Sequence, residues 1–224
     1  MKTLYSNDTY TYRLCSKEEL LENSQFVDDI TEIIEKSFSE EVKGSGANTK
    51  KILARYEHIV ITFVKATNEI VGYCFLRFHK DLSLLNYSGL SVHPSHAGKM
   101  IGFKLAKISW QMFKAKHISF TTQNPKIYQL YKLIGFKLYP HDFEIDISVD
   151  KTVSFLTKDA GRFCRKRLVF FDKYDKCLYD SIPVSKDKKI DEYFSNGLKF
   201  DDNRQSRNAF LVIGVPSKKM KKAN

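Results

Sequence analysis

The alternation of apolar and polar residues predicts strands and helices in regular succession over residues 9–140. Runs rich in β-branched and aromatic residues predict strands at 9–14, 59–65, 70–78, 84–92 and 118–123. Apolar residues that recur every three or four positions predict helices at about 16–38, 50–56, 101–112 and 125–134. Ser16 and Glu19 form a capping-box pattern at the first of these helices. The succession predicts an α/β (α+β) fold with one helix-flanked sheet.

Two connections are predicted from local composition. Residues 66–69 (ATNE) join two predicted strands as a hairpin. Residues 42–49 (VKGSGANT) are rich in glycine and polar residues and are expected to form a flexible loop.

The pattern is less regular after Pro140. We predict a helix within residues 149–163, a strand or the end of that helix at 167–171, and a further helix near 189–194. Residues 208–215 (NAFLVIGV) form a strand so apolar that it needs a sheet, and we place it beside the strand that follows the helix at 125–134.

We therefore expect a single domain over residues 1–224, with a core at about 9–140, an insertion or extension at 141–207 and a final strand at 208–215. A separate small domain from about residue 141 is the alternative.

The turn before the helix at 101–112 has features of an anion site. The preceding strand should stop before Pro94, which cannot donate to a ladder. Gly98 and Gly102 flank the helix start and allow a ligand close to the backbone. The first amides of a helix have no internal partner and favour an anion, to which Lys99 could add charge. The loop is not a P-loop, because no Ser or Thr follows Lys99, and such a loop taken alone is more often an ordinary connection.

The next helix carries two tyrosines. Asn124 is a good N-cap, Pro125 suits the first helical position, and Gly135 suits the C-terminal cap. Tyr128 and Tyr131 are three residues apart and lie on neighbouring parts of one face. A tyrosine in such an apolar stripe usually belongs to the core, with its hydroxyl at a rim.

The stretch from residue 90 to 136 resembles the GCN5-related N-acetyltransferase (GNAT) superfamily. Residues 92–105 (VHPSHAGKMIGFKL) are similar to its acetyl-coenzyme A motif, in which a proline is followed by an Arg/Gln-x-x-Gly-x-Gly/Ala loop. Residues 124–136 (NPKIYQLYKLIGF) are similar to the motif that follows, with an asparagine, a Leu-Tyr pair and a final Gly-Phe. The likeness extends over about residues 9–140.

The resemblance implies a GNAT-like fold, with a central mixed, mostly antiparallel twisted sheet flanked by helices and, here, a C-terminal extension. It implies an acyl-CoA-dependent N-acyltransferase that moves an acetyl group from acetyl-CoA, its co-substrate, to an amine without a metal. Strands 84–92 and 118–123 would splay apart to admit the pantetheine, and Tyr131 would protonate the leaving thiolate. The implied cofactor contacts are Leu90, Val92, Ala97, Gly98, Lys99, Met100, Gly102, Phe103, Asn124 and Tyr131.

Two residues depart from the family motif. Ala97 stands where the family usually has Arg or Gln, and Met100 where it usually has Gly. In the family this loop binds pyrophosphate mainly through backbone amides, so the resemblance implies that these side-chain changes need not abolish binding. Left-handed backbone angles are costly for methionine, and at a helix start we expect helical angles at Met100.

The resemblance identifies neither the general base nor the acceptor. The candidate bases are His79, Asp81 and Glu41, which border the expected cleft, or a water chain; each of the three is more often an ordinary surface residue. The acceptor could be a small amine, an aminoglycoside-like cation, a protein terminus or lysine, or an aminoacyl-tRNA. The positive charge of the chain argues weakly against polycationic acceptors.

The formal net charge is +11, with basic clusters at 162–167, 186–189 and 218–222. A phosphate-rich co-substrate explains part of this field, and a solvated lysine-rich surface explains the rest; a nucleic-acid partner is possible but not favoured. Besides an active acyltransferase, two alternatives stay open. One is a non-catalytic binding protein with this fold, and the other is a basic protein associated with nucleic acid or tRNA.

The remaining composition predicts a globular protein of the cytoplasm, as a monomer or homodimer. Hydrophobic residues make up 42% of the chain, no apolar run has the length of a membrane span, and the N-terminus (MKTLYSNDTY) shows no apolar signal-peptide core. The four cysteines (Cys15, Cys74, Cys164 and Cys177) show no paired spacing, which is typical of reduced, mostly packed thiols and lends no support to a zinc site.

Overall fold

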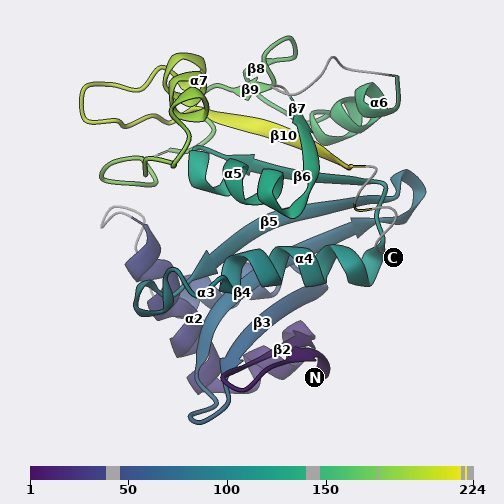
Figure 1. Ribbon diagram of the computed structural model, residues 1–224, viewed down its shortest axis with the longest axis vertical. Coiled ribbons are helices and arrows are strands. Elements are labelled where there is room, and N and C mark those ends of the chain that lie inside the picture. The colour runs from purple at the N-terminus through teal and green to yellow at the C-terminus, as the bar shows by residue number, and fades with distance from the viewer. Residues whose placement is uncertain (39–45, 140–146, 176, 218–219, 221–224) are drawn as a thin grey trace. The chain divides into compact units, whose positions relative to one another are not determined.

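The computed structural model describes residues 1–38, 46–139, 147–175, 177–217 and 220, which fold into two compact units (Figure 1). The first unit comprises residues 1–78 and 85–114, and the second comprises 79–84 and 115–224. That the whole chain forms a single domain stays a prediction.

The first unit contains strands in the order β1-β2-β3-β4-β5. Their bounds are β1 (Lys2–Ser6), β2 (Tyr10–Cys15), β3 (His58–Val64), β4 (Ile70–His79) and β5 (Leu84–Val92). Neighbours from β1 to β4 pair antiparallel, and the predicted hairpin joins β3 to β4. Strands β2 to β5 match the prediction, whereas β1 was not predicted, because its exposed residues give no apolar alternation.

The helices of this unit differ from the prediction in two places. They are α1 (Lys17–Leu21), α2 (Ser24–Ser37), α3 (Gly46–Leu53), the short 3₁₀ turn η3 (Pro94–His96) and α4 (Ile101–Phe113). The capping box at Ser16 is confirmed, but the helical region is interrupted at Asn23, which caps α2. The expectation of a loop throughout 42–49 is wrong for its second half, since α3 already starts at Gly46; residues 42–45 lie outside the described part.

Helices cover both faces of β4. On one face, apolar residues of α1, α2 and α3 pack with those of β3 and β4, among them Leu20, Ile30, Ile33, Leu53, Ile61, Tyr73 and Phe75. On the other face is α4, and a Cβ atom at Gly72 would lie 3.2 Å from Leu105 of that helix (Figure 1). Ile101 and Leu105 of the apolar stripe predicted for α4 are therefore buried, whereas Ile108 and Met112 of that stripe are half-buried.

The second unit is built around the C-terminal strand. Its elements are η2 (Lys80–Leu82), β6 (His117–Thr122), α5 (Pro125–Ile134), β7 (Phe136–Tyr139), α6 (Ile147–Leu156), β8 (Phe163–Cys164), β9 (Val169–Phe170), α7 (Lys188–Leu198) and β10 (Ala209–Pro216). Strand β10 pairs antiparallel with β6, β7 and β9, and β9 pairs with β8. The prediction that the last strand lies beside the strand after α5 is confirmed. The predicted helix at 149–163 instead ends at Leu156, before the β8–β9 hairpin.

Close packing explains why β10 is so apolar. A Cβ atom at Gly214 would lie 2.6 Å from Ile118 of β6, and one at Gly197 of α7 would lie 2.4 Å from Phe210. Both glycines therefore allow the backbone to approach closely. The ring of Tyr193 in α7 is stacked on Phe210 with centroids 5.0 Å apart. The extension thus supplies a layer that buries β10.

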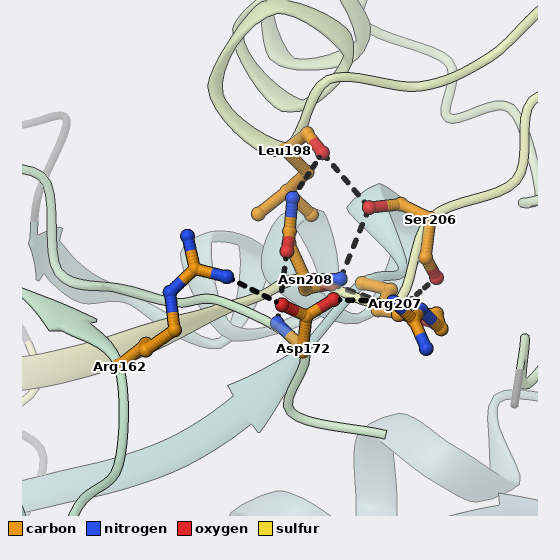
Figure 2. Close-up of polar contacts among 7 residues, drawn as sticks. Arg162, Asp172, Leu198, Ser206, Arg207 and Asn208 are labelled. Carbon is orange, nitrogen blue, oxygen red and sulfur yellow. Dashed lines mark hydrogen bonds and ion pairs between the residues drawn. The ribbon is translucent and has the colours of Figure 1, made fainter. Parts of the chain in front are cut away.

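Polar contacts fix the entry to β10, as Figure 2 shows. The Asn208 amide donates to the carbonyl of Leu198 at 2.9 Å, and its oxygen accepts from the backbone N–H of Asp172 at 3.0 Å. The Asp172 carboxylate accepts from Arg162 at 2.9 Å and from Arg207 at 2.8 Å. These contacts tie the end of α7 and the β8–β9 region to the last strand.

Candidate functional site

The chain leaves β5 through a tight turn. The ring Nδ1 of His93 accepts a hydrogen bond from the N–H of Ser95 at 3.3 Å, and the N–H of Ala97 donates to the carbonyl of Pro94 at 3.0 Å. Gly98 then takes a φ of 77°, and a Cβ atom there would meet nothing within 4 Å. Glycine is required here by the backbone angle rather than by crowding, and the loop is open on this side.

Met100 does not have the helical angles expected from its place at a helix start. Its φ of 58° and ψ of 16° are left-handed, and it is the N-cap of α4 without a side-chain hydrogen bond. Such a conformation costs a non-glycine residue about 1–2 kcal/mol. The physical reason is the sharp path between η3 and α4, which is turned by two left-handed residues, Gly98 and Met100.

The start of α4 can hold an anion. The backbone amides of Ile101, Gly102 and Phe103 follow an N-cap that offers them no side-chain acceptor. Amides at this position carry partial positive charge and point out of the helix. The exposed Lys99 precedes them in the loop. The arrangement fits a phosphate group better than a neutral ligand.

Polar contacts between residues far apart in the sequence hold this loop and the end of β5 in place. Tyr10 of β2 and His96 form a hydrogen bond between the phenol oxygen and ring Nδ1 at 2.9 Å. Burial lowers the pKa of His96, and Lys99 lowers it further, so the ring is neutral at pH 7. The hydroxyl groups of Ser37, at the end of α2, and Ser91 of β5 lie 2.6 Å apart. Sequence reasoning missed these pairs, because their partners are far apart in the chain and form no motif.

Glu32 of α2 connects Lys36 and His93 near the same region. Its carboxylate pairs with Lys36 on the same helix and lies 3.4 Å from Nε2 of His93. The hydrogen bond from Lys36 is the main cause that lowers the pKa of Glu32. The end of α2 is thereby attached to the turn after β5.

The alternation of side chains between the two faces of the sheet is interrupted in β5 before this turn. The Tyr87 hydroxyl donates to the carbonyl of Ala106 in α4 at 2.8 Å, which places Tyr87 on the α4 face. A Cβ atom at Gly89, two residues on, would lie 3.0 Å from Phe75, whose ring belongs to the opposite face. The alternation therefore breaks between Tyr87 and Gly89, as at a β-bulge. Such a break alters the direction of the backbone groups that follow, Leu90–Val92.

In the second unit, the helix α5 has the caps that the sequence predicts. The Asn124 oxygen accepts from the N–H of Lys126 at 2.9 Å, Pro125 is the first helical residue, and Gly135 has a φ of 112°. Tyr179, from the extension, forms a further hydrogen bond with the Asn124 side chain, while burial raises its pKa. The contact joins residues with no shared motif, so no local pattern predicts it.

The two tyrosines of α5 lie in the core of this unit. The Tyr131 side chain is 1% exposed, and its ring is stacked on Phe120 of β6 with centroids 4.3 Å apart. The Tyr128 hydroxyl donates to the carbonyl of Leu138 at 3.3 Å. Both side chains have packing roles, and a role of Tyr131 as a proton donor stays a prediction.

Two regions of the structure carry the sequence motifs. One is the strand, turn and helix of residues 84–113, and the other is the capped helix of residues 125–134. A comparison with protein families shows which family has these motifs. The model of the acetyltransferase (GNAT) family matches residues 27–136. The chain carries a GNAT domain. The match confirms the resemblance identified in the sequence and covers the turn after β5 and the helix α5.

Several solved structures are similar to this chain. The NatC complex bound to Gag peptide and CoA matches with a TM-score of 0.50 and 15% identity, over 93% of this chain and 99% of that chain. A GNAT-family acetyltransferase from Bacillus anthracis matches at 0.46 and 13% over 60% and 83% of the two chains. The PaiA N-acetyltransferase of Thermoplasma acidophilum, in complex with coenzyme A, matches at 0.44 and 19% over 62% and 94%. No curated protein sequence matches the chain.

The candidate general bases of the GNAT domain stay unassigned. The ring of His79 packs edge-on against Phe155 with centroids 4.8 Å apart, and Asp81 is exposed in η2. Glu41 lies outside the described residues. Cys15 and Cys74 are free and buried, and burial raises the pKa of Cys15 to about 11, so this thiol is protonated at neutral pH. None of the described helices is long and apolar enough to cross a membrane.

Proposed function

We propose that this protein is an acyl-CoA-dependent N-acyltransferase that transfers the acetyl group of acetyl-CoA to an amine. One observation carries the proposal within the GNAT domain: left-handed Gly98 and Met100 leave the first turn of α4 without a side-chain cap. A pyrophosphate is the anion that this turn suits, because several amides and Lys99 would share its charge. The net charge of +11 favours the approach of such a co-substrate.

The proposed reaction is attack of a neutral amine on the thioester carbonyl. The carbon–nitrogen bond forms, the carbon–sulfur bond breaks, and the amine loses one proton to a base or to a water chain. Backbone amides of Leu90–Val92, after the irregular part of β5, are proposed to orient the pantetheine and polarise the carbonyl. Asn124 is proposed to bind the co-substrate, and Tyr131 is proposed to return a proton to the leaving thiolate.

Binding of acetyl-CoA tests the first half of the proposal. Calorimetry should detect binding to the intact protein and lose it in Gly98→Asp and Gly102→Glu, because each places a carboxylate against the pyrophosphate. Gly98→Asn is the matched control, since asparagine has nearly the same shape as aspartate, has no charge and tolerates left-handed angles. Gly161→Asp, at a site with open space, controls for added charge elsewhere.

Unchanged affinity in both acidic variants, with the fold intact by circular dichroism, would contradict this site. Turnover tests the second half. Thiol release from acetyl-CoA with a panel of amines separates an enzyme from a protein that only binds the co-substrate.

A further inference from the structure

One face of β4 carries a row of stacked rings that ends in an arginine. Tyr73, Phe75 and Arg77 alternate along the strand and therefore project from the same face. The rings of Tyr73 and Phe75 have centroids 4.4 Å apart, and the ring of Tyr56 lies on Phe75 at 5.0 Å and 5° from parallel. The guanidinium carbon of Arg77 lies 5.1 Å from the centroid of Tyr56. The row runs from buried Tyr73 outward to exposed Arg77.

The guanidinium of Arg77 has unused binding capacity. Among the described residues, no carboxylate lies within ion-pair distance of Arg77. The guanidinium contacts the ring of Tyr56 instead. A guanidinium stacked on a ring keeps the N–H groups at its edge, which match the two oxygens of a carboxylate. Stacking also reduces the side-chain entropy that is lost when a ligand binds.

The row lies beside the irregular part of β5. A Cβ atom at Gly89 would lie 3.0 Å from Phe75 and 3.8 Å from Tyr73, so both rings lie close to β5 at Gly89. The amides of Leu90–Val92, which are proposed to polarise the thioester, come next in the strand. Tyr73 and Phe75 are buried under α1–α3, so an amine held near Leu90–Val92 would meet the row at its outer end, at half-buried Tyr56 and exposed Arg77.

We propose that Tyr56 and Arg77 form an acceptor subsite that binds a carboxylate of the amine substrate and selects acidic acceptors. The inference rests on the proposed function and names its substrate class. The carboxylate could belong to an acidic side chain near a peptide N-terminus or to a free amino acid. An acidic peptide N-terminus and a free acidic amino acid each carry an amine and a carboxylate close together. The experiment distinguishes these two sources.

The test compares acceptors that differ only in a carboxylate. Peptides that begin Ser-Glu and Ser-Gln form one pair, and free glutamate and glutamine form the other. The intact protein should favour the acid over the amide in at least one pair by roughly tenfold in kcat/KM, the lower end expected for a charged hydrogen bond. The favoured pair identifies the source of the carboxylate.

Arg77→Gln should remove this preference and leave the affinity for acetyl-CoA unchanged, whereas Arg77→Lys should keep part of it. Arg13→Gln is the matched control, because Arg13 lies over the ring of Phe63 at 4.9 Å in the same unit, on β2. The control should retain the full preference. The proposal is overturned if the intact protein shows no preference, if the preference survives in Arg77→Gln, or if that variant loses acetyl-CoA.

Failure of the proposed function gives a different result. If no amine is acetylated while acetyl-CoA binds, the enzyme assignment fails. The binding of labelled acid and amide peptides to the CoA-saturated protein, measured by fluorescence anisotropy, then tests the subsite. The intact protein should bind the acid peptide more tightly, and Arg77→Gln should lose this preference. Equal binding of both peptides to the intact protein would overturn the proposed subsite.

Discussion

Two helices of the molecule, α4 and α5, each follow a strand through a short turn, yet their first turns are completed in opposite ways. At α5, the Asn124 oxygen accepts from Lys126 N–H at 2.9 Å, and Pro125 has no N–H to satisfy. At α4, the N-cap is a strained methionine without a side-chain acceptor. The start of α5 is complete within the chain, whereas that of α4 leaves amides for an external partner.

The first turn of α5 is completed by the chain itself, and the proposed contact of Asn124 with the co-substrate would be additional to its role as a cap, whereas the first turn of α4 is left to a ligand. The α5 start has the composition that stabilises helices in general. The α4 start keeps a left-handed methionine, which costs stability and is typical of binding sites. Substitutions at Tyr131, Asn124 and Met100 can distinguish these two roles.

Substitution of Tyr131 should have the greatest consequence, because a role as proton donor would give α5 a part in the chemistry as well as in the fold. If Tyr131 is the proton donor, Tyr131→Phe should lower kcat by roughly 10²–10⁴-fold. The affinity for acetyl-CoA should change little, since the ring and its stacking on Phe120 remain. Steady-state kinetics with any acceptor that gives turnover provides the measurement.

Tyr128→Phe is the control for this substitution. Its hydroxyl donates to a backbone carbonyl in the core, so its loss should cost about 1 kcal/mol of stability and leave kcat near that of the intact enzyme. A Tyr131→Phe enzyme with near-normal kcat would remove Tyr131 from the mechanism and leave solvent as the acid.

The cap of α5 provides the second test. Asn124→Ala removes the acceptor for Lys126 N–H and should cost about 1 kcal/mol, which lowers Tm by about 2–4 °C in a chain of this size. Asn124→Asp keeps an acceptor at the helix start and should retain Tm. Equal Tm values for the two variants would show that the cap does not stabilise α5.

The sequence predicted the elements whose signals are local. Strand β5, the antiparallel β3–β4 hairpin and the caps of α5 follow from alternation and from Asn124, Pro125 and Gly135. Strand β1 was missed because it is exposed, and the β8–β9 hairpin because two-residue strands carry no period. The start of α3 at Gly46 was missed because glycine and polar residues favour a loop on local grounds alone.

The site was less predictable than the fold. The glycines and the proline identified the turn after β5, but the left-handed angles of Met100 depend on the path between η3 and α4. The pairs Tyr10–His96 and Ser37–Ser91 and the stack of Tyr56 on Phe75 join residues distant in sequence. No pattern within one segment can indicate such contacts.

The smallest expected effect concerns Met100 itself. Met100→Gly relieves left-handed strain worth about 1–2 kcal/mol and adds about 0.4–1 kcal/mol of unfolded-state entropy, so Tm should stay level or rise slightly. The affinity for acetyl-CoA should be equal or tighter, because every amide of the turn remains. Calorimetry and thermal unfolding measure the two quantities.

A second left-handed residue on the same helix makes this prediction specific. Lys114, the C-terminal cap of α4, has a φ of 49°, and Lys114→Gly should relieve similar strain far from the phosphate turn. If strain alone matters, the two variants should shift Tm alike and neither should weaken acetyl-CoA binding. A loss of binding confined to Met100→Gly would mean that the methionine side chain is itself a contact, or that its strain fixes the amides in position. The start of α4 would then depend on Met100 as the start of α5 depends on Asn124, but Met100 would serve the bound co-substrate, whereas Asn124 caps the amides of its own helix.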